Sequence, residues 1–166
     1  YRCLVWACPA HYYTNFTYWT QHCWGVTCVN DMEAMLSYLP ISTDNKDQAL
    51  ADLVRCYERM MMRSHTNGGY VNLLDECWKM CEKFNVNIVI MYDHVSCKNV
   101  GGLHGLFEDQ ARERGIHLIW IPHDVMDPRT VSRREMREAF NQYMSTVLRE
   151  EPLDPTLLDY EDALSW

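Results

Sequence analysis

The sequence predicts a doubly wound parallel α/β sheet. Three observations lead to this fold class: short apolar runs recur along the 166 residues, segments with helical spacing separate them, and the run VNIVIMY is apolar almost throughout. A near-continuous apolar run is typical of a strand covered on both faces. Strands that alternate with helices favour a parallel sheet.

The first predicted elements lie near the beginning of the chain. The run Arg2–Cys8 has the apolar character of a buried strand and is followed by Pro9. The aromatic segment Thr14–Cys23 is expected to be a helix that ends at Gly25. A second short strand is expected at Val26–Val29.

Three helices are expected in the middle of the chain. Asp31–Leu39 is a short helix that Pro40 stops, and helical spacing continues in Asp47–Arg63 and Tyr70–Phe84, with His65–Gly69 as a turn between them. Each of the two longer helices has one apolar stripe that is expected to be buried. The stripes consist of Leu50, Leu53, Val54, Tyr57, Met60 and Met61, and of Leu73, Leu74, Cys77, Met80, Cys81 and Phe84.

The last elements complete the alternating order. Strands are expected at Val86–Tyr92 and Ile116–Ile121, with a helix at Leu103–Arg114 that ends at Gly115. The pattern Ser132-x-x-Glu135 is a capping box that opens a final helix. The core stripe of this helix consists of Met136, Phe140, Met144 and Val147.

The chain is expected to hold one domain and a tail. Residues 1–150 form a single α/β domain, and residues 151–166 form an acidic tail that contains proline and ends in an anchoring Trp166. Because the chain lacks an initiator Met and begins inside an apolar run, we interpret it as a piece of a longer subunit.

Composition excludes several classes of protein. A hydrophobic content of 48% argues against disorder. A net charge of −8 without a long basic block makes nucleic acid a poor partner. Apolar runs are too short for a membrane span, and no signal peptide is recognisable. The eight cysteines lie mostly in apolar periodic segments, which favours free thiols in a reducing cytoplasm.

Three loops are candidates for the functional site, because ligands of such sheets bind beyond the carboxyl ends of the strands. They are Pro9–Tyr13, Asp93–Gly102 and Pro122–Arg129, and they are expected to meet at one edge. The third loop contains His123-Asp124 and Asp127-Pro128-Arg129, although ordinary turn chemistry also explains these residues.

Cys97 is the strongest single candidate. It sits on a loop, where a structural thiol has little reason to be, and its neighbours are Lys98, His94 and the start of a helix near Leu103. A positive field lowers the pKa of a thiol and favours the thiolate, the form that binds metal or attacks a substrate. The alternative is a half-buried small residue in a turn.

The other candidates have structural explanations of similar or greater weight. His94 could donate a proton, whereas Asp93 before it is a common turn former. Val100–Gly102 could approach a phosphate, but a tight turn explains the glycines better. Cys77 and Cys81 could join a metal site, but core thiols are favoured because no second Cys or His pair has zinc-finger spacing.

These residues alone indicate an α/β domain with one reactive or metal-binding cysteine at its edge. Two other classes stay open. A flavodoxin-like cofactor-binding protein lacks support because no Ser/Thr-rich phosphate loop follows the first strand. A thiol redox or zinc protein lacks support because the chain has no C-x-x-C pattern.

Two segments, VNIVIMYDHVSCK and RGIHLIWIPHDVMDPRTVSRREMREAFNQYM, resemble the C-terminal part of the 2-hydroxyacyl-CoA dehydratase and benzoyl-CoA reductase family. The matching positions are Cys97-Lys98 after a strand, the acidic loop Asp124–Arg129, and Ser132 at the start of a helix. The segment GGLHGLFEDQARERGIHL and the acidic tail look more like a benzoyl-CoA reductase subunit.

The resemblance implies a flavodoxin-like domain with about four to five strands and a [4Fe–4S] cluster held by three cysteines. One of these cysteines matches Cys97, and the other two come from an N-terminal half that this chain lacks. Cys3, Cys8, Cys23 and Cys28 match no family ligand position. The implied partners are a sister subunit, an ATP-hydrolysing activator with its own [4Fe–4S] cluster and an acyl-CoA substrate, in the cytoplasm of an anaerobic bacterium or archaeon.

The implied activity is the ATP-dependent dearomatisation of benzoyl-CoA by electrons of low potential. The alternatives are the radical dehydration of a 2-hydroxyacyl-CoA and a non-catalytic scaffold domain. We expect Cys97 to bind the cluster, Lys98 and Ser96 to lie beside it, and His94 to give a proton to the reduced substrate.

Overall fold

A four-stranded sheet forms the centre of the molecule. The computed structural model describes residues 1–33 and 39–160, and of residues 61–67 only the backbone. All strand pairs in the sheet are parallel, and the strand order is β2-β1-β3-β4. The strands are β1 (Arg2–Trp6), β2 (Thr27–Asp31), β3 (Ile88–His94) and β4 (His117–His123). The predicted α/β fold class is confirmed, and the architecture is that of a flavodoxin-like doubly wound fold.

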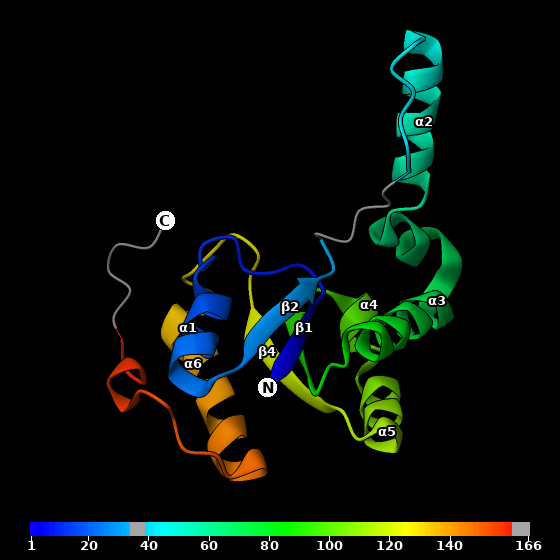
Figure 1. Ribbon diagram of the computed structural model, residues 1–166. Coiled ribbons are helices and arrows are strands. Elements are labelled where there is room, and N and C mark those ends of the chain that lie inside the picture. Colours follow the sequence, from blue (N-terminus) through cyan, green and yellow to red (C-terminus); the bar gives the residue numbers. More distant parts are fainter. Residues whose placement is uncertain (34–38, 161–166) are drawn as a thin grey trace.

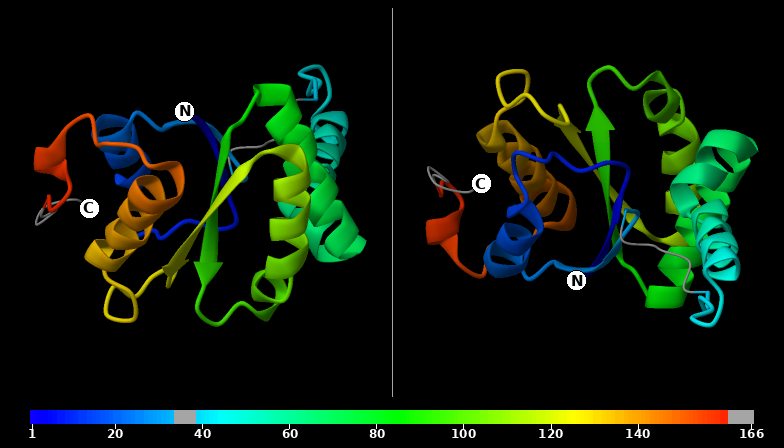
Figure 2. Two further views of the ribbon diagram at one scale, coloured as in Figure 1. Left: turned by 90° about the horizontal axis from the view of Figure 1, so that it is seen from below. Right: turned by 90° about the horizontal axis from the view of Figure 1, so that it is seen from above.

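Helices cover both faces of this sheet (Figures 1 and 2). One layer contains α1 (Phe16–Trp24) and α6 (Arg133–Tyr143). The opposite layer contains α3 (Met61–Phe84), α4 (Lys98–Gly101) and α5 (His104–Arg114). The β2 strand lies on one side of β1, and β3 and β4 lie on the other side. The direction in which the chain adds strands to the sheet therefore reverses between β1 and β3. Ligands of open α/β sheets bind at such a reversal.

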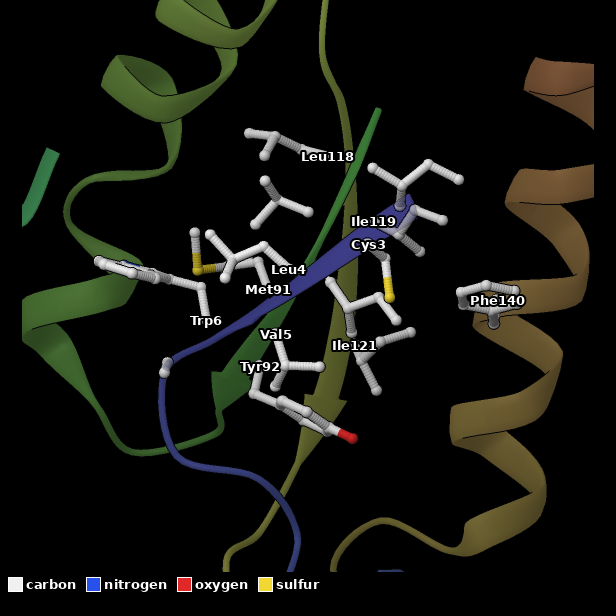
Figure 3. Packing of buried hydrophobic residues seen from close by; sticks show 14 of the residues in the cluster. Cys3, Leu4, Val5, Trp6, Met91, Tyr92, Leu118, Ile119, Ile121 and Phe140 are labelled. Carbon is white, nitrogen blue, oxygen red and sulfur yellow. The ribbon is translucent and has the colours of Figure 1, made fainter. Parts of the chain in front are cut away.

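Alternating side chains of the central strands fill the two layers of the core. Figure 3 shows Trp6 and Met91 on one side of the sheet, and Ile121 on the side of Phe140. The rings of Phe16 and Phe140 are 5.8 Å apart and meet edge to face. This alternation explains why the strands read as nearly continuous apolar runs in the sequence.

Two glycines and a capping box set three helix boundaries at the residues that the sequence indicates. The α1 and α5 helices end at Gly25 and Gly115, which adopt the left-handed conformation with φ of 69° and 66°. The capping box at the start of α6 is formed, because the Ser132 hydroxyl accepts the Glu135 N–H and the Glu135 carboxylate accepts the Ser132 N–H. These three boundaries are confirmed.

The strand ends differ from the sequence prediction by two residues. The β1 strand stops at Trp6 because Ala7 takes a positive φ of 66° and turns the chain. The β3 and β4 strands continue to His94 and His123, which pair with one another. Both histidines are therefore strand residues and not loop residues.

The predicted buried stripe of the helix after residue 46 is wrong. The helix α2 (Lys46–Glu58) has no buried residue, and four of its stripe residues are 40–62% exposed. They are Leu50, Leu53, Val54 and Tyr57. Figure 1 shows the reason, since α2 projects away from the sheet and none of the described elements covers this face.

Two further helix predictions differ in part from the structure. Residues 65–68 are helical and not a turn, but Gly69, with a φ of 72° and a ψ of 179°, breaks α3 into two helices, so the predicted break is present at Gly69. At the end of the chain Val147 is 55% exposed, because α6 ends at Tyr143 and a π-helical turn, Met144–Leu148, rotates it outward. The helix expected at Asp31–Leu39 falls largely outside the described residues, which show only a turn at residues 32–33.

The C-terminal segment lies along α1 as far as it is described. The Leu153 N–H donates to the Cys23 carbonyl over 2.7 Å, and the Trp19 indole N–H donates to the Leu157 carbonyl over 2.8 Å. The expected anchor Trp166 lies outside the described residues. None of the described helices combines the length and apolar character that a membrane crossing requires.

We predict that Phe140→Ala destabilises the protein by about 3–5 kcal/mol, because it empties a site where a fully buried ring packs against two others. Urea denaturation followed by circular dichroism measures the change. The control is Val147→Ala at the exposed position nearby, for which we expect at most about 0.5 kcal/mol. Equal effects of the two substitutions would contradict this packing.

Candidate functional site

A cavity of about 500 Å³ opens where the strand order reverses, at the carboxyl end of the sheet. It lies between the sheet and the layer that contains α3, α4 and α5. The residues that line it are Trp6, Ala7, Cys8, Met32, Gly69, Tyr70, Leu73, Met91, Tyr92, His94, Cys97, Asn99, Val100, Phe107 and His123. Most of the lining is apolar, and the chemically reactive members are two thiols and two imidazoles.

Cys97 lines this cavity, as the sequence led us to expect. It follows β3 after two residues, and its N–H donates to the carbonyl of His94 over 2.9 Å, which fixes the turn. Its side chain is half-buried. The helix that follows begins directly at Lys98 but has only four residues, and the helix predicted from Leu103 starts at His104.

Hydrogen bonds fix the orientation and the tautomer of His94. Its Nδ1 accepts the backbone N–H of Ser96 over 3.1 Å, so this nitrogen carries no proton. In the neutral ring the proton therefore sits on Nε2, which faces a carboxylate oxygen of Asp124 at 3.9 Å. The sequence indicated His94 and Asp124 separately, and the pairing of β3 with β4 brings them together.

Asp124 is held as a carboxylate. Its Oδ1 accepts the N–H groups of Met126 and Asp127 over 2.9 Å each, and its Oδ2 faces His94. These backbone hydrogen bonds lower the pKa of Asp124, and His94 adds to the effect. In the same loop the Arg129 side chain lowers the pKa of Asp127 to about 2. The acidic loop is thus a network of turn hydrogen bonds that presents one carboxylate to His94.

His123 is the buried imidazole of the cavity. It is fully buried, its ring lies 5.5 Å from that of His94, and neither ring nitrogen has a hydrogen-bond partner among the described residues. Burial lowers its pKa, and repulsion from His94 adds to the shift. Backbone carbonyl groups nearby favour the charged form, although none is in hydrogen-bond geometry. His123 is therefore a neutral imidazole at pH 7.

Lys98 and Ser96, which the sequence also indicated for the site, do not line the cavity. Lys98 is exposed and is not among the described residues that line the cavity. Ser96 contacts His94 and does not line the cavity. The N–H groups of Gly101 and Gly102 donate to the carbonyls of Cys97 and Lys98, so they serve the turn and not a phosphate.

Gly102 is required for packing in this turn. A Cβ at this position would lie 2.9 Å from the carbonyl oxygen of Lys98. Close packing therefore explains Gly102, whereas a Cβ at Gly101 would meet no atom within 4 Å. Cys77 and Cys81 are also structural, since both are buried in α3 with exposures of 0% and 2%.

Sequence reasoning missed a group formed by Cys8, His11 and Glu33. The Cys8 thiol donates to a Glu33 carboxylate oxygen over 3.0 Å, and the Cys8 Sγ lies 3.8 Å from the His11 Nε2. Burial and then Glu33 raise the pKa of Cys8 to about 12. The Cys-x-x-His spacing was visible in the sequence, but Glu33 joins only through the pairing of β1 with β2.

We predict that the free energy of unfolding falls as the pH falls from 7.5 to 5, partly because of His123. Its pKa is lowered in the folded state, so the unfolded chain, with a pKa of about 6.5, binds the proton first. In His123→Gln the fall should be smaller. Urea denaturation at several pH values measures it, with the exposed His22→Gln as the control that should keep the native slope.

Comparison with known proteins identifies the family. The family model described as 2-hydroxyglutaryl-CoA dehydratase, D-component, matches residues 1–144. No curated protein and no solved structure gives a significant match. The matched range includes all four strands and every residue that lines the cavity. The chain belongs to the 2-hydroxyglutaryl-CoA dehydratase D-component family.

Proposed function

We propose that this chain is the cluster-binding portion of an iron–sulfur enzyme that acts on an acyl-CoA. The observation that carries the proposal is the position of Cys97, in a member of this family, at a cavity where the strand order reverses. Iron–sulfur clusters are held by thiolates that protrude from a rigid support. The end of β3 and the hydrogen bond to His94 give Cys97 that support.

The donor set of the chain fits part of a [4Fe–4S] site. Cys97 is a half-buried thiol at the cavity, whereas the Cys8 thiol donates to Glu33 and faces His11. The remaining cluster ligands would come from the N-terminal half of the subunit. When bound, the cluster would supply single electrons of low potential, delivered by an ATP-hydrolysing activator and shared with a sister subunit.

The two imidazoles give the site a means to handle protons. In the neutral ring His94 holds its proton on Nε2, next to the carboxylate of Asp124. A second proton, taken from solvent at Nδ1 in place of the hydrogen bond from Ser96, would make the ring an imidazolium. The Asp124 carboxylate would stabilise that charge, and the imidazolium could pass a proton to a substrate. The lining is mostly apolar, and an apolar surrounding strengthens the electrostatic interactions of a bound substrate. His94 would therefore act as a general acid toward a reduced acyl group.

Two reactions use these parts. Reduction of an aromatic acyl-CoA such as benzoyl-CoA needs a proton donor at the ring, and the His94–Asp124 pair favours it. Dehydration of a 2-hydroxyacyl-CoA is the alternative, and the description of the matching family favours it. A complex that converts only one of the two substrate classes decides between them.

We predict that Cys97→Ser removes about one cluster per copy of the subunit from the complex purified without oxygen. Iron and acid-labile sulfide are measured together with the circular dichroism spectrum, which should stay native. The matched control is Cys56→Ser, a half-buried thiol on α2 that does not line the cavity and should keep its iron. Equal iron in the two variants would remove the metal role of Cys97.

We predict that His94→Ala leaves the cluster spectrum intact and slows turnover by about 10²-fold or more, as expected for the loss of a general acid. Turnover is measured with an aromatic acyl-CoA and with a 2-hydroxyacyl-CoA. The control is His22→Ala on the exposed face of α1. Unchanged turnover of the His94 variant would dismiss its role in proton transfer.

A further inference from the structure

We propose that Cys8, His11 and Glu33 bind one divalent transition-metal ion of the zinc type, separate from any iron–sulfur cluster. Of the three residues only Cys8 lines the cavity that contains Cys97, and its thiol faces Glu33 and His11. Their ligand atoms, a thiol sulfur, an imidazole nitrogen and a carboxylate oxygen, all lie within 4.8 Å of one another.

The fold brings these residues together from two parts of the chain. Cys8 and His11 lie on the loop after β1, and Glu33 lies two residues after the end of β2. Because β1 and β2 are parallel neighbours, their carboxyl ends meet at the same edge. The positive φ of Ala7 turns the chain just before Cys8, and the His11 N–H is held by the Val125 carbonyl over 2.9 Å.

The distances suit a tetrahedral ion. With a metal–sulfur bond of about 2.3 Å and a metal–nitrogen bond of about 2.0 Å, a tetrahedral angle separates sulfur from nitrogen by about 3.5 Å. The distance from the Cys8 Sγ to the His11 Nε2 is 3.8 Å. The distance from the Cys8 Sγ to the Glu33 carboxylate is 3.0 Å, which is a hydrogen-bond distance. The exposed Glu33 can move outward when the ion replaces the thiol proton.

The ligand types select the class of metal. Thiolate, imidazole and carboxylate together are the ligands that zinc uses, while magnesium and calcium prefer oxygen alone. Three protein ligands leave one coordination position for water or for a ligand from the cavity that Cys8 lines. The ion would also tie the loop after β1 to the end of β2, at the edge where the cavity opens.

The experiment uses the full chain after dialysis against a chelator. Co²⁺ is added without oxygen, and the difference spectrum records the thiolate-to-cobalt absorption band while cancelling the absorption of any cluster. We expect about one Co²⁺ per chain, with Zn²⁺ displacing it. Absence of the band, or binding of Co²⁺ without defined stoichiometry, would overturn the proposal.

Three variants locate the ion. We expect Cys8→Ser to lose the thiolate band. Because even the hydrogen-bond partners of metal ligands contribute about 10- to 100-fold to affinity, His11→Ala at an exposed position should weaken Co²⁺ binding by at least that factor. Cys97→Ser is the matched control, since it removes the other cavity thiol and should keep the band.

The outcomes separate this site from the cluster. Loss of the band in Cys97→Ser, or its retention in Cys8→Ser, would place the ion elsewhere and overturn the assignment. Iron and sulfide in the complex purified without oxygen should be unchanged in Cys8→Ser, and their loss would make Cys8 a cluster ligand instead. Native circular dichroism of His11→Ala keeps the test valid if Cys8→Ser fails to fold.

Discussion

The register between β3 and β4 is the constraint on which the candidate site depends. Seven consecutive pairs, from Ile88 with His117 to His94 with His123, hold the two strands in parallel to their last residues. A slip of one residue would turn every side chain of one strand to the opposite face. It would separate the two imidazoles and exchange the side chains that pack in the two layers of the core. The free energy that holds the two histidines beside one another therefore comes mostly from the burial of the apolar side chains of these strands.

The second constraint is electrostatic. The rings of His94 and His123 are 5.5 Å apart, so a charge on one opposes a charge on the other. Burial keeps His123 neutral, while the half-buried His94 has the carboxylate of Asp124 within 3.9 Å. Two chemically identical side chains thus have different environments, because one faces a carboxylate and the other is fully buried without a hydrogen-bond partner among the described residues.

Much of the fold could be predicted because its signals are local. The run Val86–Tyr92 identified a buried strand, and Gly115 identified a helix end, from residues adjacent in sequence. Cys97 could be placed at the edge of the sheet for the same reason. The partner of Cys8 could not, since Glu33 is 25 residues away and only the sheet order shows that they meet. Periodicity likewise predicted an apolar stripe on α2 but could not say what, if anything, covers it.

The exposure of α2 also determines how this helix is held. It has 13 residues, close to the length at which an isolated helix is marginal in water, and it buries none of them. Its order depends on local bonds: Asn45 accepts the N–H groups of Asp47 and Gln48, and Asp52 accepts the Ser42 N–H. Opening these few bonds leaves the sheet and the cavity intact. The molecule thus combines a cooperative core with a helix that can unfold locally, and an unfolded α2 would expose its backbone to a protease.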